Sequence, residues 1–588
     1  MYTFHSDTKI VIMIQQAKRI YAILIVSLWS LSLAGQASKP VFGHADTLRG
    51  SLNHEREYDV LKYDISITPD YNNKYIVGST TITYRDPVYE RNKKLNSDDF
   101  KSLGYLQIDL QEPLEIDSII QNSQRLSFKR EGNAFHVNTS NETSLKLHMA
   151  ESCMPCTRQI TVYYHGHPQI AGTPPWGNGG FIFTKDSLGR PWMTVTCEGT
   201  GASVWFPCKD YLGDEPDSGA SLTITVPDSL AAVANGKLIK KTSSVKGLTS
   251  WTWAVVNPIN TYNIIPYIGK YIGWHQIYFG QKGNLDCNFY VLDYDLKKAK
   301  KHFIAVDSML SCFELWFGPY PFYEDGYKLV QSPHLGMEHQ SDIAYGNNFR
   351  YGYNGKDLSG TGWGLKWDYI IVHESGHEWF GNNISCKDIA DEWIHESFTA
   401  YSEILYTGNY FGKSAGDSYC IGNRKNIKND APIIQYYGVN REPEGTDQYY
   451  KGANMIHNIR QVIHDDEIFR HIMRGLNQNF YHQTVTALDI QQYINKISGI
   501  DFTPVFNQYL RSTAIPVLEY RFEDKTIFYR WANCNPDFNM PLRVDISGVR
   551  WLKPTTEWKK ERIPKNPNPS LQVDRNFYVT EKNLTVNP

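Results

Sequence analysis

Long apolar runs are almost absent from this chain of 588 residues. The exception runs from Ile20 to Ala34, follows several basic residues and precedes small ones. At about fifteen residues it is short for a bilayer span, and this arrangement is typical of an export signal. The sequence therefore predicts a signal peptide over residues 1–37, with an uncleaved anchor as the alternative. It also predicts a periplasmic or secreted protein with no stable membrane insertion after cleavage.

An excess of charge of one sign is also lacking. Lysine and arginine number 59 and the acids 62, giving a formal net charge of −3, and no basic run is long. A nucleic-acid partner is therefore not expected. Aromatic residues at 14% and charged residues at 21% indicate a folded globular protein.

Cysteine is too sparse for a disulfide scaffold, with nine in the whole chain. Cys153 and Cys156 form one C-x-x-C pair, and no second pair completes a structural zinc site. A local disulfide or two free thiols are expected there. The odd count leaves at least one thiol without an intrachain partner.

The most informative segment is His373-Glu374-Ser375-Gly376-His377, an H-E-x-x-H pattern. On a helix, the spacing of four places both imidazoles on one face, close enough to share a tetrahedral zinc ion. A catalytic zinc site needs three protein ligands and a water. Glu396, nineteen residues after His377, can supply the third ligand from a following helix.

The flanks of these residues favour a buried site. Ile370 to Val372 precede the pattern, and Trp393, Phe398 and Tyr401 have helical spacing around Glu396. A solvated polar face is the alternative, but unpartnered acids and histidines in apolar helices would be costly. Three further acids could form a hydrogen bond with a metal ligand and so orient it: Glu403, Asp388 and Asp391.

Four motifs together resemble those of the M1 metallopeptidases, the aminopeptidase N and leukotriene hydrolase group of gluzincins. The first is H-E-x-x-H followed after eighteen residues by Glu. Leu335 to His339 is similar to the family's G-x-M-E-N stretch, with Leu335 in place of its glycine and His339 in place of its asparagine. The others are Thr194 to Asp217 and the Y-x-K-G-A stretch from Tyr449 to Ala453.

The resemblance implies a role for each of seven residues. His373, His377 and Glu396 would bind one zinc ion per chain, and Glu374 would be the general base. Glu338 and Glu198 would bind the free α-amino group of a peptide. Tyr449 would stabilise the oxyanion, with Tyr450 as a rival one position later.

Periodicity divides the chain into three parts. Residues 50–268 alternate polar and apolar, with a hairpin expected at Asn235-Gly236. Helical patterns dominate residues 269–512, including one helix from Lys297 to Trp316 and a capping box at Thr486. Residues 513–588 alternate again. The expected fold is multidomain α+β: an N-terminal β domain, a thermolysin-like catalytic domain and a small C-terminal β domain, without the family's large helical one.

These observations predict an exported zinc aminopeptidase that removes N-terminal residues from peptides. Attack by zinc-activated water, with Glu374 as base, would cleave the first peptide bond. Three alternatives stay open. An endopeptidase is one, if Glu338 and Glu198 do not bind the α-amino group. A leukotriene-type epoxide hydrolase uses the same zinc site, and a non-catalytic peptide-binding protein could retain the scaffold.

Overall fold

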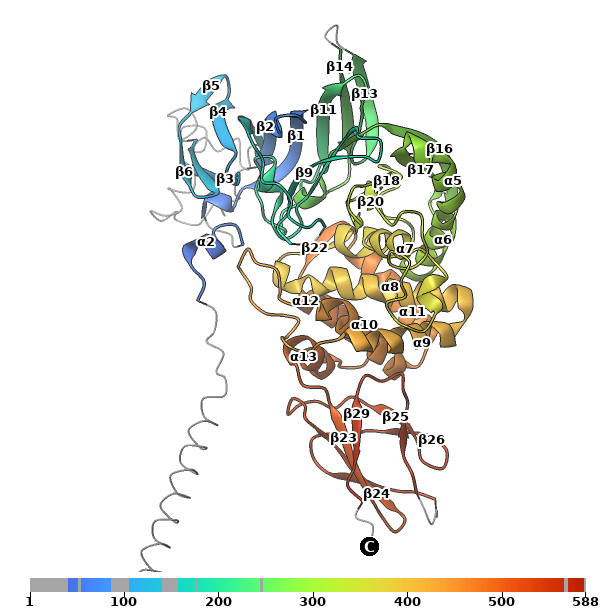
Figure 1. Cartoon of the computed structure of the whole chain (residues 1–588). Coiled ribbons are helices and arrows are strands. Elements are labelled where there is room, and N and C mark those ends of the chain that lie inside the picture. The colour runs from blue at the N-terminus through green and yellow to red at the C-terminus, as the bar shows by residue number, and fades with distance from the viewer. Residues whose placement is uncertain are drawn as a thin grey trace, which may run out of the picture. The chain divides into compact units, whose positions relative to one another are not determined.

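The computed structural model describes residues 41–50, 54–85, 105–139, 157–175, 177–243, 247–564 and 569–585 (Figure 1). The predicted signal peptide and the Cys153/Cys156 pair lie outside these residues. The chain divides into two units after Ala45, and the elements below belong to the unit from Asp46 onward. Within the described residues, no helix combines the length and apolar character needed to span a membrane.

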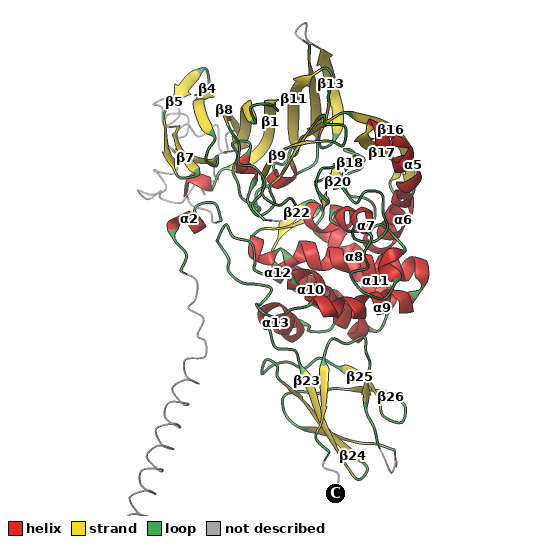
Figure 2. Cartoon of the chain, viewed as in Figure 1, coloured by secondary structure: helices red, strands yellow, loops and turns green. Residues whose placement is uncertain are grey.

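The first part of this unit is built on an eight-stranded sheet (Figure 2). Alternating burial along its strands explains the sheet: one face packs into a core and the other meets solvent. Central strands β1 and β11 are parallel, and all other neighbours are antiparallel. In sheet order the strands are β13 (Lys237–Ser243), β14 (Leu248–Val255), β11 (Ala220–Pro227), β1 (Asp59–Asp70), β2 (Tyr75–Arg85), β8 (Thr157–Gly166), β4 (Glu115–Gln121) and β5 (Gln124–Leu126).

Two smaller sheets accompany it. One has the order β12 (Ala231–Val233), β15 (Tyr267–Gly269), β10 (Pro191–Thr196) and β9 (Gly180–Lys185), and the other β3 (Tyr105–Asp109), β7 (Ala134–Asn138) and β6 (Phe128–Glu131). Strand β10 ends two residues before Glu198, one of the predicted site residues. The sheet therefore helps to position Glu198.

The hairpin predicted at Asn235-Gly236 is wrong. Strands β12 and β13 belong to different sheets, so the turn carries the chain between sheets. The Asn235 side chain instead receives the backbone N–H of Ile265 at 2.9 Å and donates to Asn263 and Gln340 carbonyls. A local turn signal cannot reveal which strands will pair.

A five-stranded sheet opens the second part. Its order is β16 (Tyr271–Gly280), β17 (Gly283–Leu292), β18 (Tyr327–Gln331), β20 (Ile343–Tyr345) and β19 (Gly336–Met337), which makes β19 an edge strand. The single helix predicted from Lys297 to Trp316 is two helices, α5 (Leu296–His302) and α6 (Ala305–Phe317). At the break, Phe303 is buried and its ring packs against Tyr345 of the sheet.

Helices then dominate the chain as predicted. They are α7 (Tyr369–Gly376), α8 (Trp393–Phe411), α9 (Lys413–Asn423), α10 (Asp447–Ile463), α11 (Asp466–Asn479), α12 (Ala487–Ser498) and α13 (Thr503–Arg511). A short parallel pair, β21 (Ile384–Cys386) and β22 (Gln483–Val485), lies among them. Thr486 and Asp489 form the predicted capping box of α12.

The last part contains two small sheets. Strands β27 (Lys559–Arg562), β24 (Thr526–Ala532), β23 (Val517–Glu523) and β29 (Thr580–Asn583) form one; β26 (Val549–Leu552), β25 (Leu542–Asp545) and β28 (Gln572–Val573) form the other. The multidomain α+β class with terminal β regions is therefore confirmed. Among the described residues, seven cysteines are free thiols: Cys197, Cys208, Cys287, Cys312, Cys386, Cys420 and Cys534. All of these except Cys534 are buried.

Candidate metal and substrate site

Helix α7 carries the first four of the five H-E-x-x-H residues and is buried along its whole length. Asp368 begins the helix by accepting the backbone N–H groups of Ile370 and Ile371 at 2.9 and 3.3 Å. The same carboxylate receives hydrogen bonds from Tyr345 and His302. One buried acid therefore fixes both the start of α7 and its position on the sheet.

Helix α7 ends within the H-E-x-x-H segment. Gly376 is its last residue, and the turn through Phe380 and Gly381 is non-helical, with a φ of 129° at Gly381. His377 keeps helical angles, so the spacing of four still places both imidazoles on one face. A Cβ on Gly376 would lie 2.7 Å from Ser402 Oγ of α8, so glycine allows the two helices to approach.

His373, His377 and Glu396 converge on one point. Their ligand atoms all lie within 4.8 Å of one another. Glu396 Oε2 lies 3.5 Å from His373 Nε2 and 3.6 Å from His377 Nε2. Tetrahedral bonds of about 2.0–2.2 Å place ligand atoms roughly 3.3–3.6 Å apart. Glu396 Oε2 is buried and has no hydrogen-bond partner among the described residues. The three side chains therefore fit a zinc ion.

Hydrogen bonds behind the histidines orient them toward Glu396. His373 Nδ1 lies 2.7 Å from Glu403 Oε1, and Glu403 also accepts from Tyr419 at 2.7 Å. His377 Nδ1 lies 3.0 Å from the Phe380 carbonyl oxygen. A carbonyl can only accept, so the proton of His377 is on Nδ1 and the Nε2 lone pair is free for a metal.

Of the three supporting acids suggested by the sequence, only Glu403 contacts a histidine of this set. Asp388 accepts the backbone N–H groups of Ala390 and Gly438. Asp391 accepts from Tyr437 and from the backbone of Ala487. Both acids hold chain segments together, and the expectation that they support a ligand is wrong.

Glu374 faces the same cavity from α7 and is 8% exposed. Burial raises its pKa to about 8; nearby carboxylates also raise it, against the lowering effect of His373. A Cβ on Gly336 of edge strand β19 would lie 2.5 Å from Glu374 Oε1. The close approach of the β19 backbone confines this carboxylate beside the three converging side chains.

Glu198 and Glu338 come together from different sheets. Burial raises the pKa of Glu198 well above its usual range, and the charge of Glu338 adds to this. Although burial raises the pKa of Glu338, the charge of His377 and a hydrogen bond from Glu198 lower it to about 2. The opposite directions of the two pKa shifts accompany a hydrogen bond between the two carboxyls. Tyr262, which the sequence did not single out, donates to Glu338 Oε1 at 3.0 Å.

Tyr449 reaches the converging residues, and its rival does not. Its hydroxyl donates to Glu396 Oε1 at 2.9 Å, and burial raises its pKa well above the usual range, so it stays protonated. Tyr450 lines the cavity, and its backbone carbonyl receives the Asn454 side chain at 2.9 Å. The geometry favours the register chosen from the sequence.

All seven predicted site residues line one cavity of about 700 Å³. Two acids and a glutamine absent from the predictions also line it: Glu392, Glu442 and Gln448. Gln448 donates to Glu392 at 3.0 Å. Glu442 belongs to no local motif, whereas Glu392 lies four residues before Glu396, a helical spacing that could have identified it.

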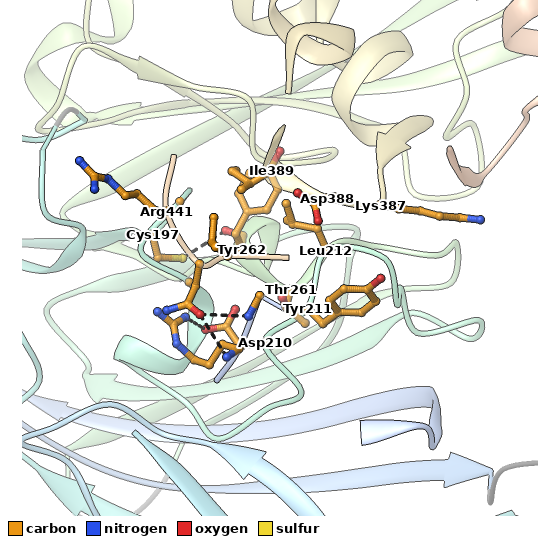
Figure 3. Close-up of a pocket in the computed structure, with 16 residues that line it drawn as sticks. Cys197, Asp210, Tyr211, Leu212, Thr261, Tyr262, Lys387, Asp388, Ile389 and Arg441 are labelled. Carbon is orange, nitrogen blue, oxygen red and sulfur yellow. Dashed lines mark hydrogen bonds and ion pairs between the residues drawn. The ribbon is translucent and has the colours of Figure 1, made fainter. Parts of the chain in front are cut away.

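A second cavity, of about 60 Å³, adjoins the segment that carries Glu198 (Figure 3). Cys197 and Gly199 line it, whereas Glu198 between them lines the large cavity. Arg49 enters it from the start of the unit and donates to Asp210 Oδ2 at 2.7 Å. The small cavity is thus bordered by segments distant in sequence.

The chain matches two domains of one family. Residues 334–509 match the Peptidase family M1 domain, and residues 60–263 match the Peptidase M1 N-terminal domain. Together they cover well over half of the chain.

Two curated aminopeptidases match part of this chain. Human endoplasmic reticulum aminopeptidase 1 is 23% identical over 315 residues, covering 51% of this chain and 32% of that one. Aminopeptidase N of Lactococcus lactis is 24% identical over 174 residues, covering 27% of this chain and 20% of that one. The chain thus spans about a third or less of these relatives' length.

The fold is similar to that of two solved proteins. A mutant M1 zinc metallopeptidase from Deinococcus radiodurans, bound to a Tyr-Ser-Ala substrate, has a TM-score of 0.60 at 19% identity and covers 78% of this chain and 96% of its own. Legionella pneumophila aminopeptidase A, in complex with aspartic acid, has a TM-score of 0.70 at 17% identity. The match covers 90% of this chain and 60% of the Legionella chain. By its two domain matches, the chain belongs to the M1 peptidase family.

Proposed function

We propose that this protein is an exported zinc aminopeptidase that removes residues from the free N-terminus of peptides. One observation carries the proposal: a three-ligand metal set and a pair of buried carboxyls open into the same cavity. Export rests on the apolar N-terminal sequence alone.

His373, His377 and Glu396 are the proposed ligands of one zinc ion. Their separations and the unpartnered oxygen of Glu396 suit it. When bound, zinc lowers the pKa of a coordinated water and polarises a carbonyl. Glu403 and the Phe380 carbonyl hold the imidazoles in the tautomer and orientation that binding requires.

Glu374 is the proposed general base. Its carboxylate accepts no hydrogen bond from any described residue and stands in the cavity beside the ligand set. It would take a proton from the attacking water and deliver it to the leaving amine. The Tyr449 hydroxyl, which burial keeps protonated, would donate to the oxyanion of the tetrahedral intermediate.

Glu198 and Glu338 are the proposed site for the substrate's α-ammonium group. An ammonium forms charge-assisted hydrogen bonds with carboxylates, and this pair is anchored by Tyr262. Holding the terminal amine at a fixed place beside the metal leaves only the first peptide bond in register. The pair therefore explains why the enzyme would trim peptides rather than cut internally.

Metal content and turnover, measured on a panel of aminoacyl chromogenic substrates, test the proposal. The purified protein should carry one zinc per chain, and chelation should abolish turnover. His373→Ala or His377→Ala should lose both metal and activity, because two protein ligands hold zinc poorly. Full zinc occupancy in either variant would contradict the ligand assignment. Turnover of epoxides but not of aminoacyl substrates would favour the epoxide hydrolase alternative.

A further inference from the structure

A pocket of about 250 Å³, here called the helical pocket, is lined by residues of α6, α8, α9, α10 and α11 (Figure 1). Among the described residues, none lines both this pocket and the cavity that contains the proposed zinc ligands. Pockets for drug-sized ligands measure about 300–1,000 Å³, so this one suits a smaller molecule. Part of its lining is apolar and buried, from Trp316, Ile404 and Leu405.

Arginine side chains make one part of the helical pocket positive. The guanidinium carbons of Arg460 and Arg470 lie 5.1 and 5.6 Å from the ring centroid of Trp316. Arg460 is only 7% exposed; its Nε donates to Asp466 and its Nη1 to Tyr401, but no described residue accepts from its Nη2. The buried Nε1 of Trp316 also has no acceptor among the described residues. A carboxylate is the ligand group that such donors bind best.

The acids of the helical pocket differ in their partners. Asp466 receives Arg460 Nε at 2.8 Å and Lys413 Nζ at 3.0 Å. Asp417, with a side chain 18% exposed, receives no hydrogen bond from any described residue. His457 Nε2 lies 3.8 Å from its Oδ1, and burial keeps that imidazole neutral by lowering its pKa to about 3. Asp417 is therefore a largely buried carboxylate that lacks a donor, and an ammonium group supplies one.

A glycine keeps the helical pocket open. Gly408 and Gly416 both line it, on α8 and α9. A Cβ on Gly416 would lie 2.7 Å from the Ile404 carbonyl oxygen, so helix packing explains that glycine. A Cβ on Gly408 would meet only the Gly416 Cα, at an ordinary 4.0 Å, so packing does not require glycine there. A larger side chain at Gly408 would therefore fill the pocket without a backbone clash.

We propose that the helical pocket binds a free α-amino acid with an apolar side chain. Its ammonium group would bind Asp417, its carboxylate would bind Arg460 and Arg470, and its side chain would pack on Trp316. A simple anion would leave Asp417 without a donor, and a simple amine would leave the arginines without an acceptor. A free amino acid is also what the proposed function releases at each turnover. Its identification as the product rests on that function, whereas the chemistry of the pocket does not.

Equilibrium dialysis with labelled L-leucine tests the proposal in the Glu338→Ala variant, which lacks one acid of the proposed amine site in the large cavity. This variant should still bind one leucine per chain. Adding Gly408→Leu should abolish this binding, and adding Asp417→Asn should weaken it by about tenfold or more. Adding Glu557→Gln, at an exposed acid of the C-terminal β region, should leave it unchanged. Absence of leucine binding, or binding that survives both pocket substitutions, would overturn the proposal.

Two analogues of leucine test the need for both charges. N-acetyl-L-leucine lacks the ammonium group and 3-methylbutylamine lacks the carboxylate, so each should bind the Glu338→Ala protein at least about tenfold more weakly than leucine does. If either analogue bound as tightly as leucine, the pocket would be a site for a simple anion or a simple amine, and the proposal would be wrong.

A crystallographic experiment needs no variant. Crystals of the unlabelled wild-type protein, soaked in L-selenomethionine, should give an anomalous selenium peak in the helical pocket beside Trp316. The absence of a peak there would overturn the proposed site. If aminoacyl substrates are not turned over but this peak is present, the proposed function fails while the pocket stands.

Discussion

Each step of the proposed chemistry is assigned to one residue. The assignment of Glu374 as general base can be tested most clearly. Glu374→Gln should retain zinc, because its three proposed ligands remain, but kcat should fall by about 10²–10⁴ as the general base is lost. Zinc content and kcat on one aminoacyl substrate are the measurements. Glu444→Gln, an exposed acid nearby, serves as the control. Near-normal turnover by Glu374→Gln would mean that another group activates the water.

Tyr449 and Tyr450 offer a matched pair at the same scale. Tyr449→Phe should lower kcat by about 10² with a smaller change in KM, because its hydrogen bond to the oxyanion forms mainly in the transition state. Tyr450→Phe should leave kcat closer to that of the wild type. Steady-state kinetics of both variants decide the register, and the reverse pattern would move the role to Tyr450.

The motif spacing was sufficient to predict which residues converge. His373, His377 and Glu396 were expected to meet because a helix fixes the first two and the third follows in the next helix. Tyr262 could not be predicted, because it reaches Glu338 through long-range packing that leaves no local pattern. Glu392 lies four residues before Glu396, so its place beside the site was open to prediction from helical spacing.

At the scale of elements, the segment Asp46–Gly50, here called the strap, connects a cavity-lining loop to the N-terminal β region through hydrogen bonds. The backbone N–H groups of Arg49 and Gly50 donate to Asn440 Oδ1 at 3.1 and 3.0 Å. The Arg49 side chain also donates to Asp210 Oδ2 at 2.7 Å. Glu442, two residues after Asn440, lines the substrate cavity, so the strap fixes one of its walls.

Asn440→Ala should therefore raise KM for short peptides with little change in zinc content. Removing the acceptor of two partly buried N–H groups costs about 1–3 kcal/mol and frees the loop. Asn440→Asp keeps an acceptor oxygen and should restore a KM close to that of the wild type. An unchanged KM in Asn440→Ala would show that the strap does not position the loop.

Local periodicity predicted the type of most elements but not their pairing. The alternation in β1 and β11 and the capping box at Thr486 are present in the structure. The turn at Asn235-Gly236 failed as a hairpin because each flanking strand finds a better partner in a separate sheet. Partner choice depends on residues far along the chain, which a local pattern does not contain.

For the whole molecule, buried His457 links the helices to the C-terminal β region. Its Nδ1 lies 3.1 Å from the Tyr401 hydroxyl, and its Nε2 lies 3.3 Å from Asn576 Oδ1. Burial lowers its pKa to about 3, helped by nearby arginine and lysine charges. Between about pH 3 and 6.5 the unfolded chain therefore binds a proton that the folded protein does not. The free energy of unfolding falls as pH falls through this window.

His457→Gln should reduce this pH dependence. Between pH 7 and 5 the histidine accounts for a loss of about 2 kcal/mol, which the variant would not incur. Urea unfolding at both pH values measures the difference. His471→Gln, an exposed histidine, should behave as the wild type does. Equal pH dependence in His457→Gln would contradict the burial argument.

The central claim is that this protein recognises a free α-amino group beside its metal. The most direct test is kcat/KM of the zinc-loaded wild-type protein on one short peptide, free and N-acetylated. Acetylation removes the positive charge that Glu198 and Glu338 are proposed to bind and adds bulk between them. The account predicts that the free peptide is cleaved one residue at a time and the acetylated one is almost inert, with this discrimination weakened in Glu338→Ala. Equal rates on the two peptides by the wild-type protein would contradict it.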